Sequence, residues 1–333
     1  MEQRVTRTFN RRRALGVGAG TLAALATGGA AAQAWPSKPI RWVVPYTPGG
    51  ITDSTTRIVT ERLTAGLGQN IVVDNRPGAN SLIGAEAVAK ATPDGYTILT
   101  VIAGHAANAT LYAGKLSFDP VKSFAPVSLM GIAPVILTVS NDFPPKDVKE
   151  LIAYAKANPG KVSFGSSGVG AAAHLTTELL KQTAGIEMVH VPYRGTAPAL
   201  QDLISGNIQV LIDVPSSMMP QVRAGKIRAL AMFSKERLEA AKDVPTIVEA
   251  GGPPIESSTW MMALAPAGTP PEIVERLSKE VAKVVALPEV KERFASMGIV
   301  PAGYDPARTG KFLADEVALW AKVIQTAGVK PEQ

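Results

Sequence analysis

Hydrophobic and polar positions follow two different periods along the chain from Trp35 onward. Short runs rich in β-branched residues, typical of buried strands, alternate with longer segments whose apolar residues recur every three to four positions, as in amphipathic helices. The expected strands cover residues 39–45, 71–73, 97–102, 135–139, 162–164, 188–191, 210–212 and 228–232. The expected helices between them cover 51–67, 147–157, 172–183 and 198–205. Strands and helices that alternate over short connections predict an α/β fold with parallel-type sheets covered on both faces.

The C-terminal part of the chain has a different pattern. A single strand at 260–265 is followed by three amphipathic helices over 271–286, 288–297 and 306–327. Helices without strands of their own need a surface to pack on, so we expect this helical extension to return to the first sheet. The pattern predicts a discontinuous first domain of residues 35–136 and 251–333, an inserted second domain of residues 137–250, and a hinge where the chain crosses twice.

The first 34 residues form a segment of a different kind. Five Arg residues and one Glu lie before Ala14, and no charged residue occurs from there to Ser37. The uncharged stretch is rich in Ala and Gly and ends in Ala32-Gln33-Ala34, which is typical of a cleaved secretory signal peptide and too weakly apolar for a membrane span. Arg11-Arg12-Arg13 indicates a twin-arginine signal. We therefore expect cleavage near Ala34 and a soluble protein in the periplasm.

The charge and cysteine content exclude several classes of protein. The 333 residues include 34 Lys or Arg and 28 Asp or Glu, a net charge of +6. The first 34 residues contribute +4 of this (five Arg, one Glu), so the other 299 carry only +2, without a basic run for nucleic acid. The chain has no Cys, which excludes disulfides, thiolate metal sites and a cysteine nucleophile.

Motifs for catalysis or cofactor binding are also missing. His105, His174 and His190 lack metal-ligand spacing, and the chain has neither a nucleophile elbow nor a P-loop. Residues 168–173 match Gly-x-Gly-x-x-Ala, but the next strand does not end in the acidic residue that would hold a ribose. We expect no metal, no cofactor and no catalysis.

Three glycine-containing turns join a strand to a helix, at residues 45–53, 165–172 and 194–198. Glycine lets backbone N–H groups approach a ligand closely, and a helix N-terminus attracts anions. Such turns lie at the carboxyl ends of strands, where open α/β sheets bind ligands. Together they predict recognition of a carboxylate by backbone amides.

Motifs in the same order along the whole mature chain resemble the Bug family, the periplasmic substrate-binding components of tripartite tricarboxylate transporters. The resemblance rests on Trp35–Ile40, Pro45–Gly50 with Asp53, Asn75–Ala79, Pro93–Tyr96, Ser166–Gly170 with His174 and Leu175, Val191–Gly195, Ala224–Leu230, Asp243–Thr246 and Ala265–Pro270.

The resemblance implies a two-domain periplasmic binding protein of type II, a Venus flytrap that closes on a small carboxylated molecule. In the family, two loops clasp a carboxylate, and a third turn and an acidic residue border the cleft. The corresponding residues here are Tyr46, Thr47, Pro48, Gly49, Gly50, Thr52 and Asp53; Ser166, Ser167, Gly168, Gly170 and Ala171; Gly195, Thr196 and Ala197; and Asp213.

Several side chains near these loops have more than one interpretation. Ser81 lies where relatives have a Gly-rich stretch, so it is a candidate for shaping the distal pocket. His105 is a candidate for ligand contact, with ordering of its own turn as the alternative. His174 is a candidate for ligand contact, with packing in its helix as the alternative. Arg194 is a candidate for a distal carboxylate or for a surface salt bridge. Asp213 would repel an anion if ionised, so a bridging water, a ligand amine or a cap on the helix at Pro215 suits it better.

The predicted partners are a small carboxylated ligand and the membrane permease subunits of a tripartite tricarboxylate transporter, with the receptor acting as a monomer. Two alternatives remain open at this point. A receptor for a signalling partner would have the same ligand site, and an exported α/β enzyme would need a nucleophile and a base within reach of the ligand.

Overall fold

The computed structural model describes residues 1–3 and 35–331, and the residues from Lys38 onward form one compact unit. The predicted signal peptide, its twin-arginine motif and its cleavage site near Ala34 lie outside the described residues. Among the residues that are described, no helix is long and apolar enough to cross a membrane.

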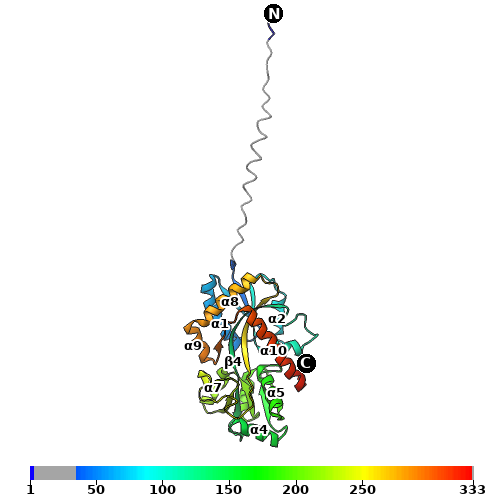
Figure 1. Ribbon diagram of the computed structural model, residues 1–333, viewed down its shortest axis with the longest axis vertical. Coiled ribbons are helices and arrows are strands. Elements are labelled where there is room, and N and C mark those ends of the chain that lie inside the picture. The colour runs from blue at the N-terminus through cyan, green and yellow to red at the C-terminus, as the bar shows by residue number, and fades with distance from the viewer. Residues whose placement is uncertain (4–34, 332–333) are drawn as a thin grey trace. The chain divides into compact units, whose positions relative to one another are not determined.

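The compact unit contains two sheets, and we call each sheet with its helices a lobe (Figure 1). The sheet of the first lobe has the order β11-β4-β10-β3-β1-β2. Its strands are β1 (Ile40–Val44), β2 (Ile71–Asn75), β3 (Thr97–Val101), β4 (Phe124–Pro134), β10 (Ser258–Pro266) and β11 (Val300–Pro301). Its helices are α1 (Ile51–Leu67), α2 (Leu82–Ala89), α3 (Ala103–Leu111), α8 (Pro271–Ala286), α9 (Pro288–Ser296) and α10 (Pro306–Ala327).

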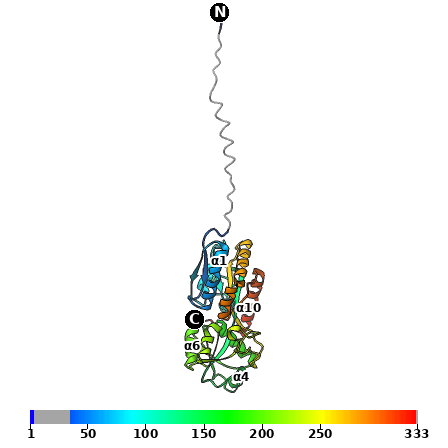
Figure 2. The same cartoon turned by 90° about the vertical axis from the view of Figure 1, so that its left-hand side faces the viewer.

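The sheet of the second lobe has the order β7-β6-β8-β5-β9. Its strands are β5 (Ile136–Ser140), β6 (Ser163–Ser166), β7 (Val189–Pro192), β8 (Val210–Asp213) and β9 (Ile227–Met232). Its helices are α4 (Val148–Ala157), α5 (Ala172–Ala184), α6 (Thr196–Ile204) and α7 (Pro215–Arg223), with a 3₁₀ turn at Glu239–Ala241. Figure 2 shows α1 in one lobe and α4 and α6 in the other.

Helix ends coincide with the residues that favour them. Helix α1 ends at Gly68, whose left-handed φ of 68° suits glycine. Helix α10 begins after Asp305, whose carboxylate accepts a hydrogen bond from the N–H of Arg308, and it has Pro306 in its first turn. Both helices have the bounds that the sequence predicts.

The chain passes between the lobes at two places that lie side by side. Strand β4 runs directly into β5 through Val135, and the return passage leads from Phe233 to β10. Backbone hydrogen bonds join the passages: Phe233 N donates to Val135 O (2.9 Å), Val135 N to Ser257 O (3.2 Å) and Ser257 N to Phe233 O (3.0 Å). The two predicted crossings are therefore present, whereas the domain bounds at 136/137 and 250/251 stay predictions.

The prediction of parallel sheets is wrong in part, because both sheets are mixed. Strand β10 pairs antiparallel with β3 and β4, and β5 pairs antiparallel with β8 and β9. The strands β1, β2 and β3 of the first lobe, and β6, β7 and β8 of the second, are parallel as expected. The antiparallel strands are those next to the crossings, where the chain enters or leaves a lobe without a crossover helix.

The C-terminal helices pack on the first lobe, as predicted. Helices α8 and α10 contact β4, and α8 also contacts α1. Trp320 of α10 is buried in the core beside Trp260 of β10. Helix α10 further contacts α5 of the second lobe, where Gln182 Nε2 donates to Val323 O (3.0 Å).

Candidate functional site

A cavity of about 470 Å³ is lined by residues from both lobes. Most of its wall comes from the first residues of five helices, two from the first lobe and three from the second. These segments are Gly50–Thr52 before and in α1, Ile102 and Gly104 at α3, Ala171–Ala173 at α5, Gly195–Pro198 at α6, and Val214 and Ser217 at α7.

The five helices begin without a side-chain cap. In this described part of the chain, none of the N-cap residues Gly50, Ile102, Ala171, Gly195 and Val214 supplies a capping hydrogen bond. The first N–H groups of an α-helix have no partner within the helix. Five such ends around one cavity give it a surface of hydrogen-bond donors with a positive electrostatic potential.

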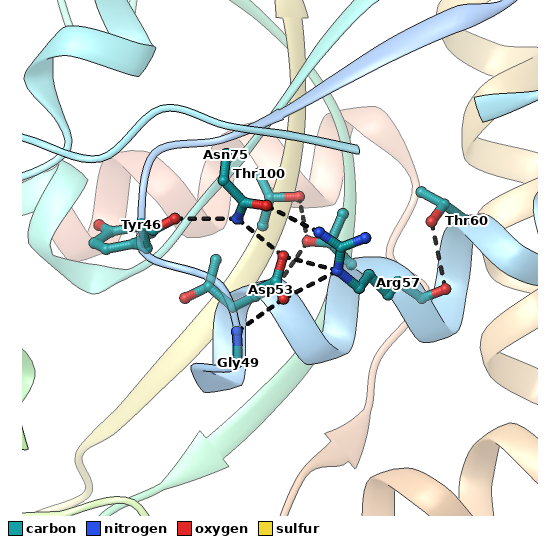
Figure 3. A network of polar contacts seen from close by, with 9 residues as sticks. Tyr46, Gly49, Asp53, Arg57, Thr60, Asn75 and Thr100 are labelled. Carbon is teal, nitrogen blue, oxygen red and sulfur yellow. Dashed lines mark hydrogen bonds and ion pairs between the residues drawn. The ribbon is translucent and has the colours of Figure 1, made fainter. Parts of the chain in front are cut away.

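The loop before α1 is held from behind by the carboxylate of Asp53 (Figure 3). Gly49 N donates to Asp53 Oδ2 (2.9 Å), Asn75 Nδ2 to Asp53 Oδ1 (2.9 Å), and Arg57 Nε to both oxygens (3.0 Å each). Asn75 Nδ2 also donates to Tyr46 O (3.1 Å), which fixes the other end of the loop. The network leaves Thr47, Gly50 and Thr52 facing the cavity.

Asp53 is ionised in this network. Burial acts to raise its pKa, but hydrogen bonds from Arg57, Gly49 and Asn75, together with the Arg57 charge, outweigh burial and hold the pKa below its usual range. Asp53 is only 3% exposed. Asp53 therefore shapes the loop from outside the cavity lining.

The loop before α5 is held from behind by neutral groups. Gly170 N donates to His174 Nδ1 (3.2 Å), and Gly168 N donates to Ser166 Oγ (3.3 Å). Ser166 Oγ also lies 2.6 Å from His190 Nε2. Among the loop residues, Ser167 and Ala171 line the cavity.

The third turn is tied to Asp213. Thr196 Oγ1 donates to Asp213 Oδ2 (2.7 Å), and Val214 N donates to Asp213 Oδ1 (2.8 Å). Burial raises the pKa of Asp213, although these two hydrogen bonds oppose the shift. Of the three roles considered for Asp213, the cap on the helix at Pro215 is excluded, since the N-cap of α7 is Val214 and no side chain in the described residues caps it.

A strained turn leads into α2 beside the cavity. Ala79, Asn80 and Ser81 have φ values of 46°, 50° and 72°, the left-handed region that glycine adopts most easily. Asn80 lines the cavity, and its Nδ2 donates to Asn108 Oδ1 (2.8 Å). Ser81 is 2% exposed and lies outside the lining. Ser81, which stands where relatives have a Gly-rich stretch, therefore does not line the cavity itself, whereas its neighbour Asn80 in the same turn does.

Two buried hydroxyls at the cavity have no hydrogen bond of accepted geometry among the described residues: Tyr46 OH and Thr259 Oγ1. Burial raises the pKa of Tyr46 to about 12, an effect that the nearby Ser81 hydroxyl opposes. The phenol therefore stays protonated and can donate to a ligand acceptor. A Cβ atom at Gly104 would lie 4.0 Å from Tyr46 OH and 3.8 Å from Gly170 O, which are ordinary van der Waals distances, so a methyl group would fit here but would occupy space where the lobes meet.

The structure brings together many of the predicted site residues and separates others from the cavity. The predicted residues in the lining are Tyr46, Thr47, Gly50, Thr52, Ser167, Ala171, Gly195, Thr196, Ala197 and Asp213. Those outside it are Pro48, Gly49, Asp53, Ser81, His105, Ser166, Gly168, Gly170 and His174.

His105 is a structural residue in this fold. It is fully buried, its Nε2 lies 2.7 Å from Pro120 O, and its ring packs edge-on against Phe124. Burial lowers its pKa to about 4 although the bond to Pro120 acts the other way, so the ring is neutral. These contacts give His105 a structural role in place of ligand contact, and the preceding Gly104 reaches the cavity.

Sequence reasoning missed several lining residues: Ile51, Asn80, Ile102, Gly104, Val135, Ala172, Ala173, Pro198, Val214, Ser217 and Thr259. Some of these belong to turns that the sequence does mark with glycine, so a search one residue further into each helix would have found them. Val135 and Thr259 lie at the crossings. In the sequence, a β-branched residue at such a position indicates only a strand and gives no sign of a cavity. Arg194, which had two interpretations, lines the cavity and makes no ion pair within the described ranges.

Two lobes that share a donor-lined cavity define a solute-binding receptor. The chain belongs to the TctC family, whose description is "Tripartite tricarboxylate transporter family receptor" and whose model matches residues 55–329. It is 35% identical to BugT of Bordetella pertussis, over 92% of this chain and 95% of BugT. The predicted Bug resemblance and receptor fold are confirmed, and the chain is a receptor of this family, not an enzyme.

Solved structures of related proteins have the same fold. An R. palustris protein solved with adipate matches with a TM-score of 0.81 and 37% identity, covering 90% of this chain and 100% of that one. MatC from Rhodopseudomonas palustris, solved with bound malate, matches with a TM-score of 0.76 and 32% identity, covering 87% of this chain and 99% of MatC.

Proposed function

We propose that the chain is a periplasmic receptor that binds a small carboxylate-bearing metabolite in the cavity between its lobes. The observation that carries the proposal is the convergence of five uncapped helix N-termini on one cavity. Each favours an anion by roughly 0.3 to 2 kcal/mol when it is well placed. Backbone donors can therefore bind a carboxylate without an arginine clamp.

The distal part of the cavity favours a second hydrogen-bonding group on the ligand. Thr259 Oγ1 is buried without a partner among the described residues, and Tyr46 OH has only the Ser81 hydroxyl nearby; a buried unsatisfied hydroxyl is destabilising by about 1 to 3 kcal/mol. Arg194 adds a positive charge to the lining. Adipate and malate, the ligands of two neighbours, each carry two carboxylates. Dicarboxylates are therefore the first candidates for this chain.

Ligand capture fits a hinge motion about the paired crossings. A ligand that contacts both lobes binds the closed form more tightly than the open form, so binding shifts the population toward closure. The family supports delivery of the ligand to a tripartite tricarboxylate-type permease. Deleting the gene should abolish uptake of that ligand if delivery is its role, whereas unchanged uptake with lost transcriptional response would favour a signalling partner.

A binding screen tests the ligand class. The melting temperature should rise with one or a few members of a panel that includes adipate, malate, monocarboxylates and amino acids. The dimethyl esters of adipate and malate, which carry no charge, should leave the melting temperature unchanged. No shift with any organic anion would overturn the proposal.

A single substitution tests the location of the site. A Cβ atom at Gly50 would have only Thr47 O nearby, at 3.8 Å, so Gly50→Val should fold. The valine side chain would project from the cavity wall, so the rise in melting temperature with ligand should be lost. Unchanged affinity in a folded Gly50→Val variant would contradict the site.

A further inference from the structure

Two histidines form a stack behind the loop that precedes α5. His174 lies in the first turn of α5 and His190 in β7, and their ring centroids are 3.8 Å apart with an interplanar angle of 10°. The His190 ring stacks in turn on Phe164 of β6, at 4.9 Å and 22°. His174 is 3% exposed. The stack is thus part of the second lobe and lies outside the cavity lining.

Each imidazole makes a hydrogen bond to the loop. Gly170 N donates to His174 Nδ1 (3.2 Å), and Ser166 Oγ lies 2.6 Å from His190 Nε2. Ser166 Oγ also donates to Gly168 O (3.2 Å) and accepts from Gly168 N (3.3 Å). The two rings therefore fix the loop backbone at residues 168 and 170.

The hydrogen bond from Gly170 requires a neutral ring. An imidazole nitrogen accepts only through its lone pair, so His174 must carry its proton on Nε2. Among residues 35–331, the charged groups that face the pair are on α5: Lys181, which disfavours a second cation, and Glu178, whose Oε1 lies 3.9 Å from His174 Nε2. Across the stack, β6 contributes Phe164 and Ser166, which are uncharged, and β7 contributes His190 itself.

The environment keeps both rings neutral at physiological pH. Burial, followed by the charges of His190 and Lys181, lowers the pKa of His174 to about 3. Burial and Lys181 lower the pKa of His190 to about 4. Both values lie well below the ordinary value of about 6.5.

The loop that the histidines hold is in contact with the other lobe. A Cβ atom at Gly170 would lie 2.5 Å from Leu111 Cδ1 of α3 and 3.5 Å from Asn80 Nδ2. On the same loop, Ser167 and Ala171 face the cavity. A displacement of Gly170 would therefore change both the cavity wall and the contact between lobes.

We propose that His174 and His190 are positioning residues for ligand binding: as a neutral stacked pair, with His174 accepting from Gly170 N and His190 hydrogen-bonded to Ser166 Oγ, they hold the Ser166–Gly170 loop so that the N-terminus of α5 presents its amides to the carboxylate. The inference rests on the proposed function for its binding readout. It assigns these residues a role that neither ligand contact nor simple core packing describes.

Matched variants separate the acceptor from the packing. In His174→Asn the amide oxygen stands close to the former Nδ1 and can accept from Gly170, whereas His174→Leu fills the space without an acceptor. With adipate or malate as the probe, whichever the wild-type protein binds, the dissociation constant should rise at least tenfold in His174→Leu and less than threefold in His174→Asn. His190→Gln, whose amide replaces Nε2, and His190→Leu should differ in the same direction.

A ligand-free measurement makes the two proposals distinguishable. Amide hydrogen exchange at Gly170, followed by NMR in the full chain, should accelerate at least tenfold in His174→Leu and remain near wild type in His174→Asn. If the wild-type protein binds no carboxylate, the proposed function fails while the exchange data still decide the role of His174.

Two outcomes would overturn the positioning role. One is wild-type affinity and exchange in both His174 variants. The other is equal loss in both variants, which would show that packing of the ring matters and its acceptor does not. Should His174→Leu not fold, the wild-type protein decides: acid should accelerate Gly170 exchange, relative to a buried strand amide such as that of Leu211, as His174 protonates.

Discussion

The loops before α1 and α5 present backbone to the same cavity but are held by groups of different charge. In the first lobe the ionised carboxylate of Asp53 accepts from Gly49 N, and Arg57 and Asn75 also donate to it. In the second lobe the neutral imidazole of His174 accepts from Gly170 N. Each loop thus gives up one glycine N–H to an acceptor behind it, which fixes the loop and leaves the helix N-terminus for the ligand.

The difference in charge has consequences for acid and for substitution. The pKa of Asp53 is held below its usual range by the hydrogen bonds and charge of its partners, so its network persists at pH values where an ordinary aspartate begins to protonate. His174 has a pKa of about 3 in the folded protein, but an unfolded chain protonates this residue near pH 6.5. The histidine side of the cavity therefore becomes a source of acid sensitivity over a range in which the aspartate side is unaffected.

The largest expected effect is on stability between pH 7.5 and pH 5. His174 and His190 have lowered pKa values in the folded state, so below pH 6.5 the unfolded state binds more protons and the free energy of unfolding falls. The expected loss by pH 5 is about 2 kcal/mol for His174 and about 1 kcal/mol for His190, whose ring is partly accessible. His105, buried in the first lobe, also has a lowered pKa, so its protonation in the unfolded state lowers the free energy of unfolding further, by an amount similar to that for His174.

Urea unfolding of the wild-type protein and of the double variant His174→Asn/His190→Gln at both pH values checks this prediction. The double variant should lose about 3 kcal/mol less than wild type between pH 7.5 and 5, with the His105 contribution remaining. Equal losses in the two proteins would mean that the stack does not titrate as described.

A pair of glycine substitutions compares the two loops by shape. Gly49 and Gly170 have φ values of 86° and 81°, so alanine is strained at both. At Gly49 a Cβ atom would meet nothing within 4 Å, whereas at Gly170 it would lie 2.5 Å from Leu111 Cδ1. Gly49→Ala should lower the free energy of unfolding by about 1 kcal/mol and Gly170→Ala by about 2 to 3 kcal/mol. Equal effects in urea unfolding would show that the lobes separate readily at this contact.

The next largest effect on stability is expected when the charged acceptor of one loop, Asp53, and a neutral acceptor of the other loop, Ser166, are each removed. Asp53→Asn leaves three donors facing an amide with a single acceptor oxygen, and should destabilise the protein by about 2 kcal/mol. Ser166→Ala removes a neutral hydroxyl, with an expected loss of about 1 kcal/mol. Calorimetric melting of both variants ranks them, and the comparison fails if Ser166→Ala is the more destabilising.

The sequence predicts those parts of the fold that local chemistry determines. Helices α1, α8 and α10 have the predicted bounds because Pro, Asp and Gly mark their ends. Helix α3 was missed because it is buried on most sides and has no amphipathic pattern. Strand β4 was missed because Pro126 and Gly131 interrupt its apolar run. The antiparallel direction of β5 and β10 depends on how the chain crosses between lobes, which no local pattern encodes.

The site was predictable to the level of turns and not of side chains. Glycine marks the turns at Gly50 and Gly195, whose residues do line the cavity. Whether a polar residue in such a turn faces the ligand or holds the turn from behind depends on tertiary contacts. Asp53 lies behind its loop with Asn75, 22 residues away in sequence, as one such partner, whereas the bond that places His174 behind its loop comes from Gly170, a local partner four residues away.

The smallest effects on stability are expected from removing the cation beside each acceptor, Arg57 in the first lobe and Lys181 in the second. These two substitutions also give the clearest contrast between the loops. Arg57 is half exposed and Lys181 pairs with Glu178 at 2.7 Å, so Arg57→Gln and Lys181→Gln should each change the free energy of unfolding by about 0.5 kcal/mol or less at pH 7.5. Lys181→Gln removes a positive charge that disfavours imidazolium, so the pKa values of His174 and His190 should both rise. Arg57→Gln should leave them unchanged. Titration of the histidine ring protons by NMR in the two variants measures this contrast, and identical titration curves would show that only burial keeps the second loop's anchors neutral.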